Sequence, residues 1–204
     1  MENEDQPLSH TQSLGIIEKM IAAAKNEHRE KGDGWLLWGW LLFIASVLSA
    51  VFMKTALTQY IGWTWTGVLV VGFSLMLYLY LTRKNKEEVT TYVQGLLNKF
   101  STGFFISLLV LVAASNLSGS SFSFGYYYVL YAFWMFIHGS AIRFQPLIIG
   151  AIVNWAAAIA IFVTPDFFYK MVISAIAILV GYLIPGYMLR NQFKKLSQAN
   201  KESI

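Results

Sequence analysis

The sequence predicts an all-α integral membrane protein, a bundle of six transmembrane helices, on three observations. Of its 204 residues, 56% are hydrophobic and only 13% are charged, whereas soluble domains average about 25% charged residues. The apolar residues form uncharged blocks long enough to cross the roughly 30 Å hydrocarbon layer, which takes about 20 helical residues. Lys and Arg residues gather at alternate ends of these blocks, as expected when loops on one side of a membrane carry the positive charge.

Six spans arise from five uncharged stretches, because the third stretch, residues 100–142, is about twice as long as one crossing requires. A Ser/Asn/Gly cluster at 115–121 divides it, as expected of a turn. Pro146 suits the first turn of a helix, and Asp166 is placed to cap the last span. The predicted spans are 34–53, 62–82, 101–117, 123–142, 146–163 and 168–189, and together they form a transmembrane domain over residues 34–190.

The basic residues predict the orientation of the chain. Thirteen of the fifteen Lys and Arg residues fall on one side of the predicted spans, and only Lys54 and Lys170 fall on the other. Because positively charged loops resist translocation, we expect a multi-pass protein of the cytoplasmic membrane with both termini in the cytoplasm. Trp63 and Trp65 near a span end are interpreted as lipid anchors, with packing inside the bundle as the alternative.

Two segments outside the spans have one apolar face. Residues 1–33 form a cytoplasmic N-terminal segment with an amphipathic helix, and residues 86–99 form a second amphipathic segment before the third span. Such a helix must bury its apolar face, either on the inner headgroup surface or against a cytoplasmic protein or a second copy of the chain. The N-terminal face comprises Leu14, Ile17, Met20, Ile21 and Ala24. Residues 191–204 form a cytoplasmic tail.

The spans also suggest three related hairpins. Each odd span has an early glycine and each even span ends in an arginine, at similar spacing. These residues are Gly39, Gly103 and Gly150, and Arg83, Arg143 and Arg190.

Polar groups within the hydrocarbon are costly, so those that occur are candidate functional residues. His138, in the fourth span, has a side chain that can change charge near neutral pH, and Arg143 follows it toward the cytoplasm. Asn154, in the fifth span, can hydrogen-bond across helices or contact a polar substrate. Pro185 lacks the N–H of a helical hydrogen bond and predicts a kink in the sixth span. Structural roles are the simpler interpretation of all four.

Three stretches of this chain, 34–43, 138–150 and 181–190, are similar to a family of uncharacterised bacterial inner-membrane proteins with several spans. The similarity covers most of the chain. It implies a bacterial cytoplasmic membrane and assigns no activity to any residue.

The sequence contains no cysteine, Gly-rich phosphate loop, paired carboxylates or His-x-x-x-His pattern, so most enzyme classes lack their minimal parts. We expect no enzyme activity, no cofactor and no metal, and no nucleic acid among its partners. The leading hypothesis is a scaffold or regulatory subunit in the bilayer, with a cytoplasmic partner or a homo-oligomeric contact.

Two other functions remain open. The alternative to a scaffold is a small transporter or channel with a path near His138 and Asn154. A third hypothesis is a lipid-modifying enzyme that uses His138 and Arg143. A cavity at His138 and Asn154 would favour transport, whereas a sealed bundle would favour interaction.

Overall fold

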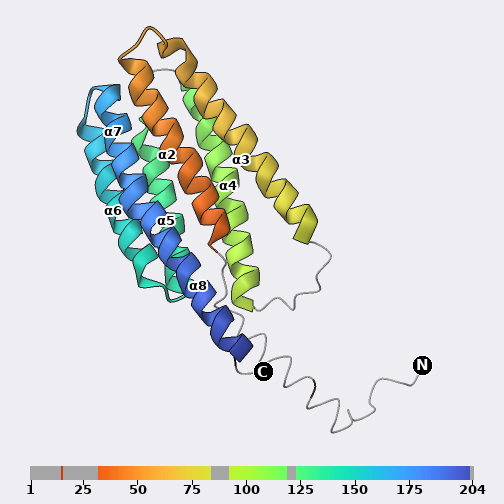
Figure 1. Ribbon diagram of the computed structural model, residues 1–204. Coiled ribbons are helices and arrows are strands. Elements are labelled where there is room, and N and C mark those ends of the chain that lie inside the picture. The colour runs from red at the N-terminus through yellow and green to blue at the C-terminus, as the bar shows by residue number, and fades with distance from the viewer. Residues whose placement is uncertain (1–14, 16–31, 84–91, 119–122, 203–204) are drawn as a thin grey trace.

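The computed structural model describes residues 15, 32–83, 92–118 and 123–202, and every element in these ranges is a helix or a helical turn (Figure 1). The helices are α2 (Asp33–Met53), α3 (Ile61–Arg83), α4 (Tyr92–Ser118), α5 (Gly125–Ala141), α6 (Gln145–Val163), α7 (Phe167–Ile178) and α8 (Ile184–Glu202). A 3-10 turn, η1 (Thr58–Tyr60), precedes α3, and a π-helical turn, η3 (Leu179–Leu183), joins α7 to α8. The all-α class is therefore confirmed.

Five helical segments are long and apolar enough to cross a membrane, which supports a multi-pass membrane protein. They are α2, α3 with its preceding turn, α4, α6 and the continuous helix formed by α7, η3 and the first part of α8. Helix α5 has 17 residues, slightly fewer than the usual span. The count of six spans therefore stays a prediction.

The observed helices differ from the predicted spans mainly at the basic ends. Helix α4 begins at Tyr92 and runs without interruption through the predicted third span, so part of the segment at 86–99 belongs to a long helix. Helix α8 continues to Glu202, beyond the predicted end of the sixth span. The N-terminal face at Leu14, Ile17, Met20, Ile21 and Ala24 lies outside the described residues, as do residues 86–91.

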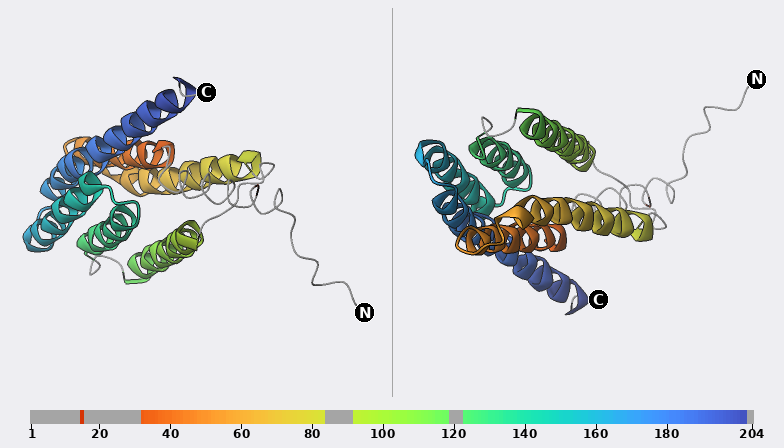
Figure 2. Two further views of the ribbon diagram at one scale, coloured as in Figure 1. Left: turned by 90° about the horizontal axis from the view of Figure 1, so that it is seen from below. Right: turned by 90° about the horizontal axis from the view of Figure 1, so that it is seen from above.

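The bundle has two distinct ends (Figure 1). We call the end with η1, Phe124 and Pro165 the loop end, and the end with the start of α2, Arg143 and Arg190 the terminal end. Figures 1 and 2 show α3 and α4 on one side of the bundle and α6 and α7 on the other, with α8 extending past its neighbours at the terminal end.

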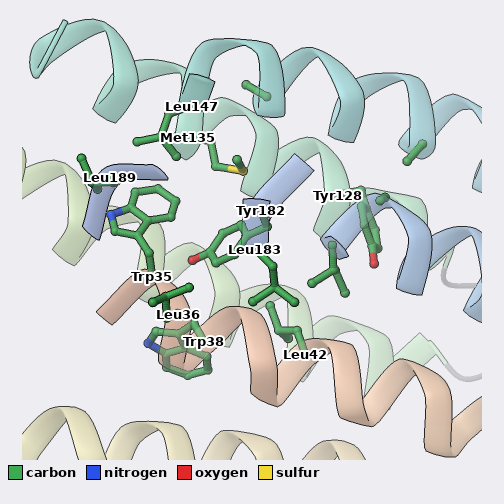
Figure 3. Packing of buried hydrophobic residues seen from close by; sticks show 14 of the residues in the cluster. Trp35, Leu36, Trp38, Leu42, Tyr128, Met135, Leu147, Tyr182, Leu183 and Leu189 are labelled. Atoms are coloured by element: carbon green, nitrogen blue, oxygen red, sulfur yellow. The ribbon is translucent and has the colours of Figure 1, made fainter. Parts of the chain in front are cut away.

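The core lies between α2, α5, α6 and the α7–η3–α8 helix. Figure 3 shows large side chains from these helices meeting there, with the Tyr182 ring beside Trp35 and Leu183 facing α2. Helix α6 crosses η3 closely, because a Cβ on Gly150 would overlap the carbonyl oxygen of Gly181. Apolar side chains and close backbone contact thus hold these helices together.

Helix α3 stands apart from this core. Most of its side chains are exposed, as expected for lipid contact, and Val68 is its one buried apolar side chain among those described. The Trp38 ring packs directly against the backbone of Gly72. A Cβ added at Gly72 would lie only 2.5 Å from the nearest atom of that ring. Contact between α3 and α2 therefore depends on a few small or aromatic residues.

The kink predicted at Pro185 stays a prediction, but a π-helical turn, η3, lies close to the proline. Proline lacks an N–H and would clash with the carbonyl four residues earlier, which belongs to Gly181. The wider turn at Leu179–Leu183 ends two residues before the proline and contains Gly181, and π-helical turns commonly accompany such a conflict within a helix.

Arg143 ends α5 in a conformation that usually belongs to glycine. Its φ is 54°, which is left-handed and unfavourable for a residue with a Cβ. The Phe144 N–H donates to the Gly139 carbonyl at 2.8 Å and the Arg143 N–H donates to that of Ser140 at 3.2 Å. These two bonds form a Schellman motif.

The structure does not confirm the three-hairpin repeat. A Cβ on Gly39 would meet Leu183 and Tyr182, whereas a Cβ on Gly103 would meet nothing within 4 Å. Arg190 lies inside α8 instead of at its end. The glycines and arginines at equivalent positions therefore lie in different environments.

Candidate functional site

A cavity of about 570 Å³ lies between α2, α3, α4 and α5, and α6, α7 and η3 complete its wall. Its polar lining residues are Thr66, Ser115, Asn116, Tyr127, Tyr128, Tyr131, Asn154, Lys170 and Tyr182. Its aromatic lining residues without a hydroxyl are Trp38, Trp65, Phe124 and Phe167. The remaining lining residues are mainly aliphatic. An apolar pocket with a few polar groups is the usual form of a small-molecule site.

The cavity opens toward the loop end of the bundle. Gly62, Thr66, Asn116 and Pro165 line it there and are exposed. At the opposite end, three lining residues are buried: Trp38 of α2, Asn154 of α6 and Tyr182 of η3.

Aromatic rings close the cavity on its terminal-end side. The Trp38 ring lies 5.8 Å from both Phe73 of α3 and Phe105 of α4, measured between ring centroids, and these two rings lie 5.6 Å apart. Phe73 and Phe105 are each closer to the terminal end than the lining residues of the same helix. The three rings therefore pack against one another between α2, α3 and α4 beneath the cavity.

Helix α5 supplies one wall through residues at helical spacing. Phe124, Tyr127, Tyr128 and Tyr131 recur at three- and four-residue intervals, so they share one face of the helix. The Tyr127 hydroxyl donates to the Ser115 hydroxyl on α4 at 3.0 Å. This bond holds α4 beside α5 at the loop end.

The hydroxyl of Tyr128 lies beside those of Ser174 on α7 and Ser46 on α2. Both serines are fully buried. The Ser46 hydroxyl donates to the Leu42 carbonyl of its own helix at 2.9 Å, whereas the Ser174 hydroxyl has no hydrogen-bond partner among the described residues, which is unusual for a buried hydroxyl.

Helix α3 supplies the opposite wall through Trp65. Its indole N–H donates to the Ser49 hydroxyl on α2 at 3.1 Å, and its ring lies 5.1 Å from that of Phe124. Trp63, two residues earlier, is 74% exposed. Of the two tryptophans interpreted as lipid anchors, Trp63 points outward, whereas Trp65 packs inside the bundle.

Asn154 lies at the buried base of the cavity and is 2% exposed. Its Nδ2 donates to the Gly150 carbonyl at 2.8 Å and contacts the Met135 sulfur at 3.6 Å. Among the described residues no donor reaches its Oδ1. The amide oxygen can therefore accept a hydrogen bond from a molecule in the cavity.

His138 lies outside the cavity lining. Its ring is 5.3 Å from that of Trp35 and 5.4 Å from that of Trp134, and the two indoles stack on each other at 4.3 Å. Arg143 and Pro185 are likewise absent from the lining. The structure therefore separates Asn154 from the other three residues singled out in the sequence.

Lys170, at the loop end, is the one charged side chain among the lining residues. Asp166, one turn earlier, directs its carboxylate to the Phe168 N–H at 2.8 Å and caps α7, as predicted. Lys54 lies over the Phe168 ring at 4.3 Å, a cation–π contact. Of these charged groups, Lys170 alone reaches the cavity.

The described residues contain no group of three or more His, Asp or Glu side chains that could hold a metal ion. Comparison of the chain with protein-family models, with curated proteins and with solved structures found no match. Candidate functions therefore depend on the cavity and its residues.

Sequence reasoning found Asn154 but missed the tyrosines of α5. The signal was their spacing, since Phe124, Tyr127, Tyr128 and Tyr131 fall on one helical face. Asn116 lies in the Ser/Asn/Gly cluster that predicts a turn, and Lys170 entered only the prediction of orientation, so neither was linked to a site.

Proposed function

We propose that this is a membrane protein that binds a small, mostly apolar molecule in the cavity between α2, α3, α4 and α5. The observation that carries the proposal is the cavity itself. Its volume of about 570 Å³ falls within the roughly 300–1,000 Å³ typical of small-molecule sites. Aromatic walls offer apolar contact, and the Asn154 amide and the tyrosine hydroxyls offer a few polar contacts.

Within the alternatives posed by the sequence, this proposal favours the transporter class over the scaffold. The support comes from Asn154, which lines the cavity, whereas His138 packs among aromatic rings. Passage across the membrane would require the Trp38, Phe73 and Phe105 rings to separate. While these rings remain in contact, the protein can bind a ligand in the cavity but cannot pass it across the membrane.

The scaffold hypothesis stays a prediction, because its docking face at Leu14, Ile17, Met20, Ile21 and Ala24 lies outside the described residues.

We also propose that α5 crosses the membrane as a sixth span and that both termini are cytoplasmic. Support for the first comes from the burial of Ala132 and Met135 midway along α5. Support for the second comes from the distribution of Lys and Arg.

A tryptophan-quenching experiment tests the proposed binding. Bromine atoms quench a tryptophan that they touch, so the purified protein in detergent is titrated with dibromostearate methyl ester, an uncharged apolar probe. We expect saturable quenching, because the probe enters a cavity with Trp65 and Trp38 in its wall.

The matched variants are Trp65→Phe and Trp63→Phe, on the same helix. The saturable component should shrink in Trp65→Phe and persist in Trp63→Phe, since Trp63 points away from the cavity. Quenching that rises without saturation, or that depends on Trp63 alone, would show that the probe dissolves around the protein and would refute the proposed function.

A further inference from the structure

We infer that the ligand of this cavity is a long-chain carboxylic acid whose carboxylate lies at Lys170 and whose single tail extends along the aliphatic lining of Leu42, Leu108 and Ile178. This inference rests on the proposed function and specifies the chemical class of its ligand. It follows from the charge of the lining and from the length and volume of the cavity.

The charge of the lining points to an anion. Lys170 is half-buried and lines the cavity, and none of the described residues that line it carries a carboxylate. The nearest acid along the chain, Asp166, is used to cap α7. Within the described residues Lys170 has no ion-pair partner, so a partly buried ammonium is left to attract a negative group.

Two further polar residues lie at the loop end of the cavity. Thr66 and Asn116 line the loop end of the same cavity. Their side chains also bond their own helices, Thr66 to the Gly62 carbonyl at 3.0 Å and Asn116 to the Val112 carbonyl at 2.8 Å. A polar rim with one cation favours a ligand with one charged end.

The length of the cavity matches one acyl chain. Lys170 and Tyr182 line it from the same continuous helix, and at 1.5 Å per residue they are separated by about 18 Å along the axis. One acyl chain covers half of the roughly 30 Å hydrocarbon layer, or about 15 Å. A tail beginning at Lys170 would therefore end near the buried base at Tyr182.

The lining distinguishes the tail from the head. Leu42, Leu69, Leu108 and Ile178 line the cavity between its polar rim and its base. A volume of about 570 Å³ suits one such tail in preference to the two acyl chains of a bilayer phospholipid. We therefore assign the site to a free acid instead of an anionic phospholipid.

The experiment compares dibromostearate with its methyl ester in the quenching titration, using the full-length protein in detergent. The acid should bind at least tenfold more tightly than the ester, because a hydrogen bond to a charged group contributes about 1.5–3 kcal/mol and each 1.4 kcal/mol is tenfold in affinity. Lys170→Gln should reduce acid binding to the level of the ester, and Lys170→Arg should retain most of the preference.

Lys54→Gln is the matched control, since it removes the other loop-end lysine, which contacts Phe168 and does not line the cavity. A third arm adds unbrominated phosphatidylglycerol as a competitor, and it should displace the acid far less well than palmitate does. Melting temperatures of the variants equal to that of the original protein would show that the variants remain folded.

Each of the remaining outcomes would overturn a different part of the proposal. Saturable quenching that is equal for acid and ester would leave the proposed cavity standing and overturn the assignment of an anion. An equal loss in Lys54→Gln and Lys170→Gln, or no loss in Lys170→Gln, would overturn the role of Lys170. Displacement by phosphatidylglycerol as effective as by palmitate would assign the site to a lipid headgroup. An absence of saturable quenching by either probe would refute the proposed function itself.

Discussion

Replacing Gly150 with alanine should loosen the core, because α6 and η3 touch through their backbones at this point. An added Cβ would overlap the Gly181 carbonyl oxygen and would lie 2.9 Å from the Met135 methyl carbon. The methionine side chain can rotate away, but the carbonyl belongs to a helical turn and can move only with the helix. The two helices must therefore separate.

The expected magnitude combines two opposing effects. Overpacking of a well-packed core costs about 1–3 kcal/mol, and contact with backbone places Gly150→Ala near the upper value. Alanine in a helix is more favourable than glycine by about 1 kcal/mol. We expect a net destabilisation of roughly 2 kcal/mol for Gly150→Ala.

The matched control is Gly103→Ala in α4, where an added Cβ would meet nothing within 4 Å. This variant should gain stability by up to about 1 kcal/mol from helix propensity alone. The assay is reversible unfolding in mixed micelles of increasing dodecyl sulfate content, followed by circular dichroism. The reasoning would be refuted if Gly150→Ala unfolded at the same dodecyl sulfate content as Gly103→Ala.

Three further predictions use the same unfolding assay. Arg143→Gly should be more stable than Arg143→Ala by about 1 kcal/mol, because glycine alone relieves the left-handed φ; equal stabilities would contradict this. Asp33→Asn should cost less than about 1 kcal/mol, because its 3.5 Å ion pair with Arg190 joins side chains that are 50% and 43% exposed; a larger loss would show that the pair is shielded from solvent. Ser49→Ala should cost about 1 kcal/mol and shift the tryptophan emission, since it removes the acceptor of the Trp65 indole; an unchanged spectrum would show that the bond is not formed.

Hydropathy predicted most helix positions, because the cost of exposing backbone in lipid forces each apolar block to form a helix. The α6 span was predicted at 146–163 and observed at Gln145–Val163. The extensions of α4 and α8 could not be predicted in the same way. Residues beyond the hydrocarbon are free of that constraint, and their helices continue through local propensity and packing.

The faces of the helices were less predictable than their positions. A helix that is apolar all round carries no periodic signal for the side that meets its neighbours. Trp63 and Trp65 illustrate this, since both are interfacial aromatics in sequence and only the structure shows that one points outward and the other inward. The same ambiguity concealed the tyrosines of α5.

Asn154 was identified because a polar group in the hydrocarbon is costly and invites a function. The argument applied equally to His138, which the structure places among aromatic rings beside Trp35. Whether a buried polar residue faces a cavity depends on contacts between helices far apart in the sequence. Single-sequence reasoning has no access to those contacts.

The central claim is that a ligand occupies the cavity, and photolabelling tests it most directly. A fatty acid with a diazirine in its tail is bound at low concentration, irradiated, and located on the protein by mass spectrometry. The account predicts labels on Leu69, Leu108 and Val112, which line the cavity, and suppression of these labels by excess palmitate. Labels of equal intensity on Val70, Leu109 and Val110, which are exposed on the same helices, would show that the probe remains in the surrounding lipid and would contradict the claim.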